Sequence, residues 1–304
     1  MGSTVFERHP TAENVIDHSL SGSVLKPFWT EDAPRSTKQP HFAGYDTADL
    51  VIVGGGYTGL WTALLAAQKK LFTRIVVLEA KTCGWAASGR NGGFVESTLT
   101  HGESNGRTRF PDEYDLLDRL GMENLDEIQA TVTKNKWNVD FERNGSFAVA
   151  TEEYQVEDLR HEADGERTIF MTEQEIQKKV SSPTYLGALF EPKETALVHP
   201  AKLANSLMTA CLDAGVMIYE NSPVTDLDAQ AEGIVLSTKK GKIRAGRVSL
   251  ATNAFPSLLK RYRLHTVPVY DYVLMTEPLT AAQLQSIGWS GREGIADSAN
   301  QFHY

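Results

Sequence analysis

Residues 49–59 read Asp-Leu-Val-Ile-Val-Gly-Gly-Gly-Tyr-Thr-Gly, a short apolar run that leads into a glycine-rich turn. Such a run is typical of a buried parallel strand. A helix is expected next, because apolar residues recur at helical spacing at Leu60, Ala63, Leu64 and Ala67. A second apolar run occupies residues 74–79. The stretch therefore predicts a β-α-β unit of about thirty residues.

The three spaced glycines of the turn each have a separate physical role. Gly54 permits the tight turn, Gly56 lets the backbone approach a pyrophosphate, and Gly59 lets the helix pack close to the strand. The start of the helix then presents free N–H groups and a positive dipole end to the phosphates. The turn therefore predicts a dinucleotide site.

Glu79 ends the second strand, 20 residues beyond Gly59. A carboxylate at this place accepts hydrogen bonds from the ribose hydroxyls of an adenosine, and it would repel a 2′-phosphate. NADP is therefore disfavoured. FAD and NAD share this half-site, so the unit leaves the choice between them open.

The segment 84–93 reads Gly-Trp-Ala-Ala-Ser-Gly-Arg-Asn-Gly-Gly and is rich in small residues. Such a loop can wrap closely around a flat ring system, with Arg90 and Asn91 as polar contacts. This composition favours a flavin over a nicotinamide. An ordinary glycine-rich surface loop is the alternative interpretation.

Two of these stretches together resemble a known family. The run from Asp49 to Ala63, followed by Ser88-Gly-Arg-Asn-Gly-Gly93, resembles the flavin-dependent oxidoreductases of the D-amino-acid oxidase type. Within them the chain is most similar to the gamma-glutamylputrescine oxidoreductase-like group. The resemblance extends from about residue 20 to the end, with supporting stretches at residues 199–203, 250–254 and 276–279.

The resemblance implies a set of FAD-binding residues. They are Gly54, Gly56, Tyr57, Thr58, Gly59, Glu79, Ala80, Ser88, Arg90, Asn91, Gly92, Gly93, Val224, Ala251 and Thr252. Within this set, residues 88–93 would lie along the ribityl chain and the isoalloxazine. Val224 would meet the adenine through its backbone. Ala251 and Thr252 would flank the pyrophosphate.

The resemblance also implies the chemistry. The family oxidises a C–N bond by moving a hydride equivalent from the substrate to the flavin, after which the imine product hydrolyses. No histidine stands in the segment 84–93, and Cys83 is interpreted as a small buried residue, so noncovalent FAD is expected. No catalytic side chain is assigned. An NAD-dependent dehydrogenase and a non-catalytic dinucleotide-binding fragment are the alternatives.

The expected fold class is α/β, with a Rossmann-like FAD-binding domain interleaved with a substrate domain built on an antiparallel sheet. The FAD domain is expected over 48–140 and 196–262, and the substrate domain over 141–195 and 263–304. Residues 1–47 are expected to form an N-terminal arm with local order around Phe28 and Trp29, the alternative being a partly disordered tail.

Two weaker expectations concern single stretches. Residues 267–275 alternate like a long strand, on which Tyr270 and Tyr272 either pack in the sheet or cover an amine substrate. Residues 301–304 look like the middle of a strand. We therefore expect a truncated version of a longer enzyme, with weak or absent flavin and little or no turnover. The alternative is a naturally shorter homologue with a complete site.

Composition and charge exclude several classes of function. The formal net charge of −9 disfavours nucleic acid, which binds clustered lysine and arginine. No apolar run reaches the roughly 20 residues that span a bilayer, and residues 1–18 lack the apolar core of a secretory signal. Cys83 and Cys211 are far apart and have no metal-ligand spacing. A cytoplasmic protein that acts on a small amine, without a metal, is expected.

Overall fold

The computed structural model describes residues 4–8, 10–35, 37–299 and 303–304. The chain divides into two compact units. The first unit comprises Met1–Lys26, Gly92–Val198 and Met275–Tyr304, and the second comprises Pro27–Asn91 and His199–Leu274. The domain boundaries expected from the sequence stay a prediction.

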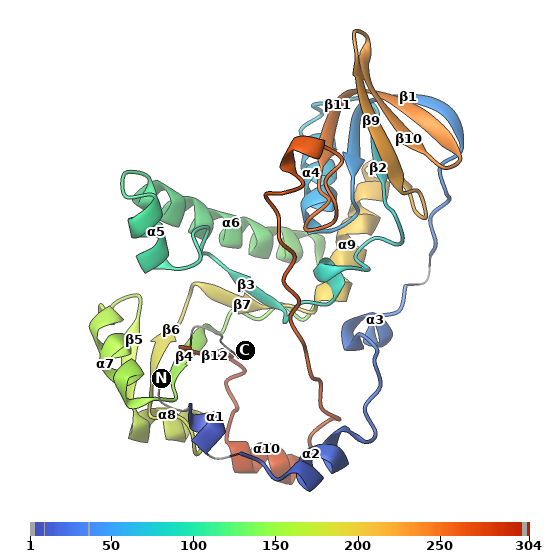
Figure 1. Cartoon of the computed structure of the whole chain (residues 1–304). Helices are drawn as coiled ribbons and strands as arrows, with labels where there is room; N and C mark the ends of the chain where they lie inside the picture. The colour runs from blue at the N-terminus through green and yellow to red at the C-terminus, as the bar shows by residue number, and fades with distance from the viewer. Residues whose placement is uncertain (1–3, 9, 36, 300–302) are drawn as a thin grey trace. The chain divides into compact units, whose positions relative to one another are not determined.

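The second unit is built on a six-stranded sheet (Figure 1). Its strands, in spatial order, are β8 (Met217–Tyr219), β2 (Ile75–Leu78), β1 (Gly44–Val53), β11 (Gly241–Leu250), β10 (Gly233–Thr238) and β9 (Val224–Gln230). The first four run parallel, and β10 pairs antiparallel with both β11 and β9. Strands β10 and β11 are joined by a turn at residues 239–240.

Two helices of the second unit pack against each other, α4 (Tyr57–Gln68) and α9 (Pro200–Asp213) (Figure 1). Helix α9 begins with Pro200 in its first turn, where the missing N–H costs nothing. The shorter helices of this unit are α3 (Phe28–Asp32) and the 3-10 turns η1 (Ala87–Gly89) and η2 (Lys260–Tyr262).

The β-α-β unit predicted from the sequence is confirmed as β1, α4 and β2. Val51 and Ile52 at the centre of β1 are completely buried, as are Val76 and Val77 of β2. Apolar residues on both faces are what a central parallel strand requires, since both of its faces are covered. The carboxyl ends of β1 and β2 therefore sit on a rigid part of the core.

The first unit contains a four-stranded sheet in the order β12 (Gly294–Asp297), β4 (Ser146–Ala150), β6 (Gly187–Glu191) and β5 (Ile169–Thr172). Strand β6 pairs antiparallel with β4 and β5, as expected for the substrate domain, and β12 pairs parallel with β4. A separate pair joins β3 (Phe94–Glu96) to β7 (Thr195–Leu197). The helices of this unit are α1 (Val5–Arg8), α2 (Glu13–Leu20), α5 (Glu103–Arg109), α6 (Tyr114–Asn135), α7 (Glu153–Glu162), α8 (Glu173–Lys179) and α10 (Ala281–Ile287). The α/β fold class is confirmed.

The strand expected over residues 267–275 is wrong. This segment has no regular structure, and the side chain of Tyr272 is 98% exposed. An alternating pattern forms a strand only beside another strand, and none of the described strands pairs with this segment. Packing of Tyr270 within a sheet is therefore also wrong. The strand expected at 301–304 falls partly on residues 301–302, outside the described residues.

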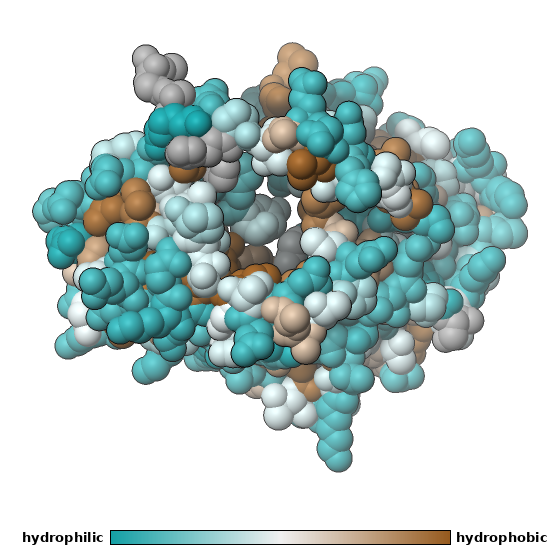
Figure 2. Space-filling view, turned by 90° about the horizontal axis from the view of Figure 1, so that it is seen from below, coloured by the Kyte–Doolittle hydropathy of each residue, from teal (hydrophilic) through white to brown (hydrophobic). Residues whose placement is uncertain are grey.

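The surface is largely polar. Figure 2 shows one face on which hydrophilic residues predominate and hydrophobic residues form separate patches. Among the described residues, no helix combines the length and apolarity needed to cross a membrane.

Candidate cofactor site

The turn after β1 can be made only by glycine at its first position. Gly54 has φ +112°, and its N–H donates to the carbonyl oxygen of Leu78 over 2.9 Å. A Cβ on Gly54 would lie 2.4 Å from the carbonyl oxygen of Ala251, just beyond β11. A side chain here would therefore both strain the backbone and separate the ends of β1 and β11.

The start of α4 is equally tight. A Cβ on Gly59 would lie 1.9 Å from the carbonyl oxygen of Gly54, so a side chain would push the helix off the turn. Gly56 is the residue that caps α4, and the N–H of Tyr57 donates to Oγ of Ser88 over 2.9 Å. Ser88 thus lies at the positive end of the helix dipole, where a phosphate is stabilised.

Glu79 is buried at the end of β2, only 5% exposed. Its Oε2 accepts the N–H of Gly55 over 2.6 Å, and its Oε1 accepts the N–H of Lys81 over 2.8 Å. The carboxylate is therefore held by the backbone on both sides, directly beside the glycine turn. These bonds fix its oxygens where ribose hydroxyls meet a dinucleotide fold.

Trp85 completes the surroundings of this carboxylate. Its indole N–H donates to Oε1 of Glu79 over 2.9 Å. The ammonium of Lys81 lies 3.9 Å from the centre of the Trp85 ring, a cation–π distance, and Phe255 lies 5.7 Å away. The Nε of Arg90 donates to the carbonyl oxygen of Trp85 over 2.6 Å. Sequence reasoning missed the role of Trp85, since no spacing indicates where an indole N–H will point.

Tyr57 joins the start of α4 to α9. Its hydroxyl donates to the carbonyl oxygen of Pro200 over 2.9 Å. Burial raises the pKa of the Tyr57 phenol far above its usual value, and a hydrogen bond with Asn91 lowers it in part. The phenol is therefore neutral throughout the working pH range and acts as a fixed support.

The remaining expected residues divide between the two units. In the second unit, Ala251 donates its N–H to Val53 over 2.9 Å, and the carbonyl oxygen of Thr252 accepts the N–H of Phe255 over 3.1 Å. Val224 opens β9 and is half-buried.

Four other expected residues lie either next to the turn and Glu79 or in the first unit. Thr58 and Ala80 are exposed next to the turn and Glu79. Gly92 and Gly93 belong to the first unit, where the N–H of Val198 donates to the carbonyl oxygen of Gly93 over 2.9 Å.

The structure thus brings seven of the fifteen expected residues together within the second unit. They are Gly54, Gly56, Tyr57, Gly59, Glu79, Ser88 and Ala251. They gather at the carboxyl ends of β1, β2 and β11, the edge at which open α/β sheets bind their ligands.

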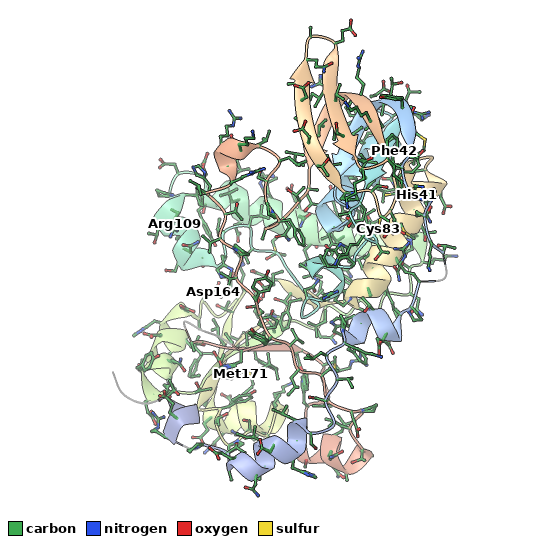
Figure 3. All side chains as sticks on the ribbon, turned by 45° about the vertical axis from the view of Figure 1, so that its right-hand side comes forward. His41, Phe42, Cys83, Arg109, Asp164 and Met171 are labelled. Atoms are coloured by element: carbon green, nitrogen blue, oxygen red, sulfur yellow. The ribbon has the colours of Figure 1, made fainter. Side chains whose placement is uncertain are left out.

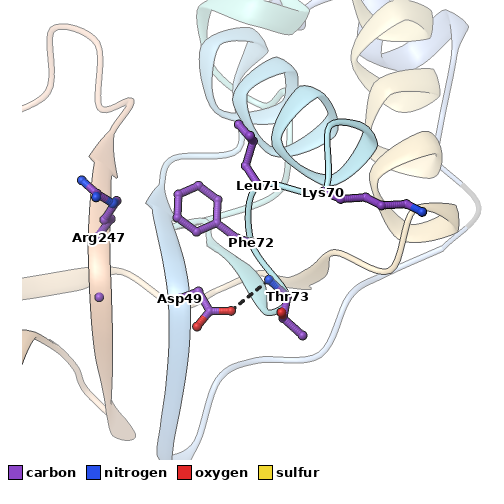
Figure 4. A pocket seen from close by; sticks show the side chains of 7 residues that line it. Asp49, Lys70, Leu71, Phe72, Thr73 and Arg247 are labelled. Atoms are coloured by element: carbon purple, nitrogen blue, oxygen red, sulfur yellow. Dashed lines mark hydrogen bonds between the residues drawn. The ribbon is translucent and has the colours of Figure 1, made fainter.

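A pocket of about 600 Å³ lies on this unit away from that edge (Figure 4). Its lining includes Lys70, Phe72 and Arg247, and Oδ2 of Asp49 accepts the N–H of Thr73 over 2.9 Å. Thr73 precedes β2, so the pocket is next to the amino end of that strand. It is therefore separate from the cofactor edge.

Comparison with known proteins decides the family. The family described as "FAD dependent oxidoreductase" matches residues 49–304. The chain belongs to this FAD dependent oxidoreductase family. The NAD-dependent alternative is therefore wrong: the β-α-β unit is common to both cofactors, and the family to which this chain belongs uses FAD.

Individual members of the family support this assignment. The chain is 27% identical over 276 residues to the probable oxidoreductase OrdL of Haemophilus influenzae, covering 86% of this chain and 63% of the relative. It is 30% identical over 254 residues to gamma-glutamylputrescine oxidoreductase of Escherichia coli, covering 79% and 58%. The chain thus spans about three fifths of the length of these relatives.

A solved structure shows the same fold. The glycine oxidase from Geobacillus kaustophilus superposes with a TM-score of 0.60 at 24% identity, covering 72% of this chain and 59% of the oxidase.

The residues present fit FAD. The glycine turn suits a pyrophosphate at Gly56, where a Cβ would crowd Ser88 at the start of α4, and the Glu79 carboxylate suits a ribose. Cys83 beside them is buried, and burial, with Glu220 and Glu79 nearby, raises the pKa of its thiol. A neutral, buried thiol is a poor nucleophile. Among the described residues, no cluster of His, Cys, Asp and Glu is suited to a metal ion.

Proposed function

We propose that this chain forms the FAD-binding part of an oxidoreductase that oxidises the C–N bond of an amine or an amino-acid-like compound. One observation carries the proposal. The turn at Gly54, the buried carboxylate of Glu79 and Ala251, just beyond β11, meet at the carboxyl ends of the parallel strands. Family membership and the names of the relatives, an oxidoreductase of gamma-glutamylputrescine and a glycine oxidase, support the substrate class.

The protein's part in the reaction is to bind and orient. Glu79 accepts the ribose hydroxyls, and the N–H groups at the start of α4 face the pyrophosphate. The small residues of the segment 84–93 let the backbone approach the flavin ring closely. When bound, FAD supplies the acceptor for a hydride equivalent from the substrate carbon. No side chain is assigned as a general acid or base.

The cofactor is bound noncovalently in this proposal, because the segment 84–93 has no histidine and Cys83 is buried with a raised pKa. The partner is a small amine. Nucleic acid is not a partner, because the net charge is −9, and the location is the cytoplasm, where two unpaired cysteines stay reduced.

The test uses the purified 304-residue protein. We expect binding of added FAD, visible flavin absorbance, and release of free flavin after acid precipitation. Under anaerobic conditions, one member of a panel of amines and amino acids should bleach the bound flavin. Flavin retained in the precipitate would contradict noncovalent binding. Tight FAD binding without bleaching by any amine would favour a non-catalytic dinucleotide-binding module, and no FAD or ADP binding would overturn the proposal entirely.

A further inference from the structure

The segment 27–40, of which the structure describes residues 27–35 and 37–40, precedes the β-α-β unit and belongs to the second unit. Its helix α3 contacts α9. The indole N–H of Trp29 donates to the carbonyl oxygen of Asn91 over 2.9 Å. This bond ties the segment to the end of the loop that runs from Cys83 to Asn91.

Trp29 is itself held in place by His199. The two rings meet edge to face, with their centres 4.8 Å apart. His199 is 4% exposed, and its Nδ1 accepts the N–H of Lys202 over 3.2 Å. Its Nε2 therefore carries the proton and donates to Oδ2 of Asp32 over 3.2 Å. The ring against which Trp29 packs thus has one fixed orientation.

The other end of the segment is fastened to Glu220, which is completely buried. Arg35 forms an ion pair with this carboxylate, and the N–H of Gln39 donates to Oε2 over 3.1 Å. Burial alone would raise the pKa of Glu220, but hydrogen bonds from Arg35, Cys83 and Gln39 lower it below its usual value. The carboxylate is therefore ionised, and the pair is a charged contact that is largely buried.

The same carboxylate holds the beginning of the loop. Oε1 of Glu220 accepts the N–H of Cys83 over 2.7 Å. Figure 3 labels Cys83 together with His41 and Phe42, which directly follow the segment. Phe42 is buried in the core of the sheet, and its N–H donates to Oγ of Ser222 over 2.8 Å. The residues that directly follow the segment are thus anchored in the core of the sheet.

These contacts fasten the loop at both ends, Cys83 through Glu220 and Asn91 through Trp29. Between these ends lies Ser88, whose Oγ accepts the N–H of Tyr57 at the start of α4. The start of the loop also contacts the β-α-β unit, because the N–H of Gly84 donates to the carbonyl oxygen of Gly55 over 2.9 Å. The far end of the loop, at Asn91, is the part that Trp29 holds.

We propose that the segment 27–40 is a brace for the loop 83–91, and that Trp29 is a positioning residue for the flavin end of the cofactor. The inference rests on the proposed function, since it takes the flavin to lie along this loop. Trp29 acts through the backbone of Asn91, at the opposite end of the loop from Cys83.

The test is Trp29→Phe, which keeps an aromatic ring against His199 and removes the N–H bonded to Asn91. The matched control is Trp289→Phe, at a residue in the first unit that is 39% exposed. In hydrogen exchange of the protein without added nucleotide, we expect faster exchange at residues 88–91 in Trp29→Phe alone. The amides of β1, and those of α4 beyond Tyr57, should be unchanged.

Titration with FAD and with ADP supplies the second readout. We expect the FAD dissociation constant to rise about 3- to 10-fold in Trp29→Phe, the effect of one lost hydrogen bond, while the ADP constant changes less than about twofold. Equal weakening of FAD binding and ADP binding would show that Trp29 has a general structural role, and it would overturn the proposal. Unchanged exchange at residues 88–91 would also overturn it, whether or not FAD binds. Failure of the unaltered protein to bind both ligands would instead contradict the proposed function.

Discussion

Trp85 donates its indole N–H to Oε1 of Glu79 over 2.9 Å, at the oxygen that also accepts the N–H of Lys81. Both lone-pair positions of Oε1 therefore already accept hydrogen bonds from the protein. A ribose hydroxyl that approaches Oε1 must displace the indole. The Trp85 side chain thus competes with the adenosine for this oxygen of the carboxylate.

Trp85→Phe should bind ADP more tightly than the unaltered protein. The phenylalanine ring keeps the apolar contacts and frees one acceptor position on Glu79. We expect an increase in ADP affinity of about 2- to 10-fold, the range for one hydrogen bond, measured by isothermal titration calorimetry. Weaker ADP binding would show instead that the indole N–H orients the carboxylate for the ribose.

Glu79→Ala should weaken FAD and ADP alike. The change removes the acceptor for the ribose and leaves the N–H groups of Gly55 and Lys81 unpaired, so we expect a loss of about 1–3 kcal/mol of binding free energy. Glu232→Ala, at an exposed carboxylate between β9 and β10, is the control. Unchanged nucleotide affinity in Glu79→Ala would show that Glu79 does not bind the nucleotide.

Two glycine substitutions should have different effects, one on the stability of the fold and the other on nucleotide binding. A Cβ on Gly59 meets the backbone oxygen of Gly54 at 1.9 Å, so Gly59→Ala should lower the free energy of unfolding by at least about 3 kcal/mol. A Cβ on Gly56 meets only the Ser88 hydroxyl at 2.8 Å. Gly56→Val should therefore fold but bind ADP on the order of tenfold more weakly or worse, because the side chain occupies the phosphate position.

Urea denaturation and calorimetry measure the two effects separately. Gly22→Ala is the control for both, since a Cβ on Gly22 meets nothing within 4 Å. A Gly56→Val protein that binds nucleotide normally would show that the turn serves the fold alone.

The first unit should lose stability as the pH rises toward 8. Burial, together with the nearby Glu194, raises the pKa of Glu191 to about 8 from 4.5. Above pH 4.5 the unfolded chain gives up this proton while the folded chain keeps it, so stability is full below that pH and falls until the folded pKa is passed. Glu191→Gln removes this ionisation and keeps an oxygen to accept from Thr195.

We expect the free energy of unfolding of Glu191→Gln to change less between pH 5 and pH 8 than that of the unaltered protein. Urea denaturation at both pH values measures it. Glu153→Gln, at an exposed carboxyl in α7, is the control. The same pH dependence in Glu191→Gln and the unaltered protein would contradict the raised pKa.

The core of the site could be predicted from sequence because its signals are local. The apolar run of β1, the glycine spacing and the position of Glu79 all lie within about thirty residues. The contact of Trp85 with Glu79 could not be predicted, since it depends on a side-chain orientation set by the folded loop. The same holds for Trp29 and Asn91, whose contact joins residues 62 positions apart.

The expectation for residues 267–275 failed for a related reason. Alternation along one segment shows that it can form a strand, but a strand needs a neighbour, and periodicity carries no information about the partner. The domain boundaries stay a prediction on the same ground, because they depend on contacts between distant parts of the chain.

The pairing of β1 with β11 has a consequence for how the chain is made. Leu50 of β1 pairs with Arg247 of β11, so β1 lacks this neighbour until about 200 more residues have been synthesised. At about 5–20 residues per second, the interval on the ribosome is roughly 10–40 s. During it the apolar residues of β1 have only β2 beside them, and an unpaired strand edge invites association with other chains. Chaperones that cover this strand on the ribosome should therefore raise the yield of folded protein.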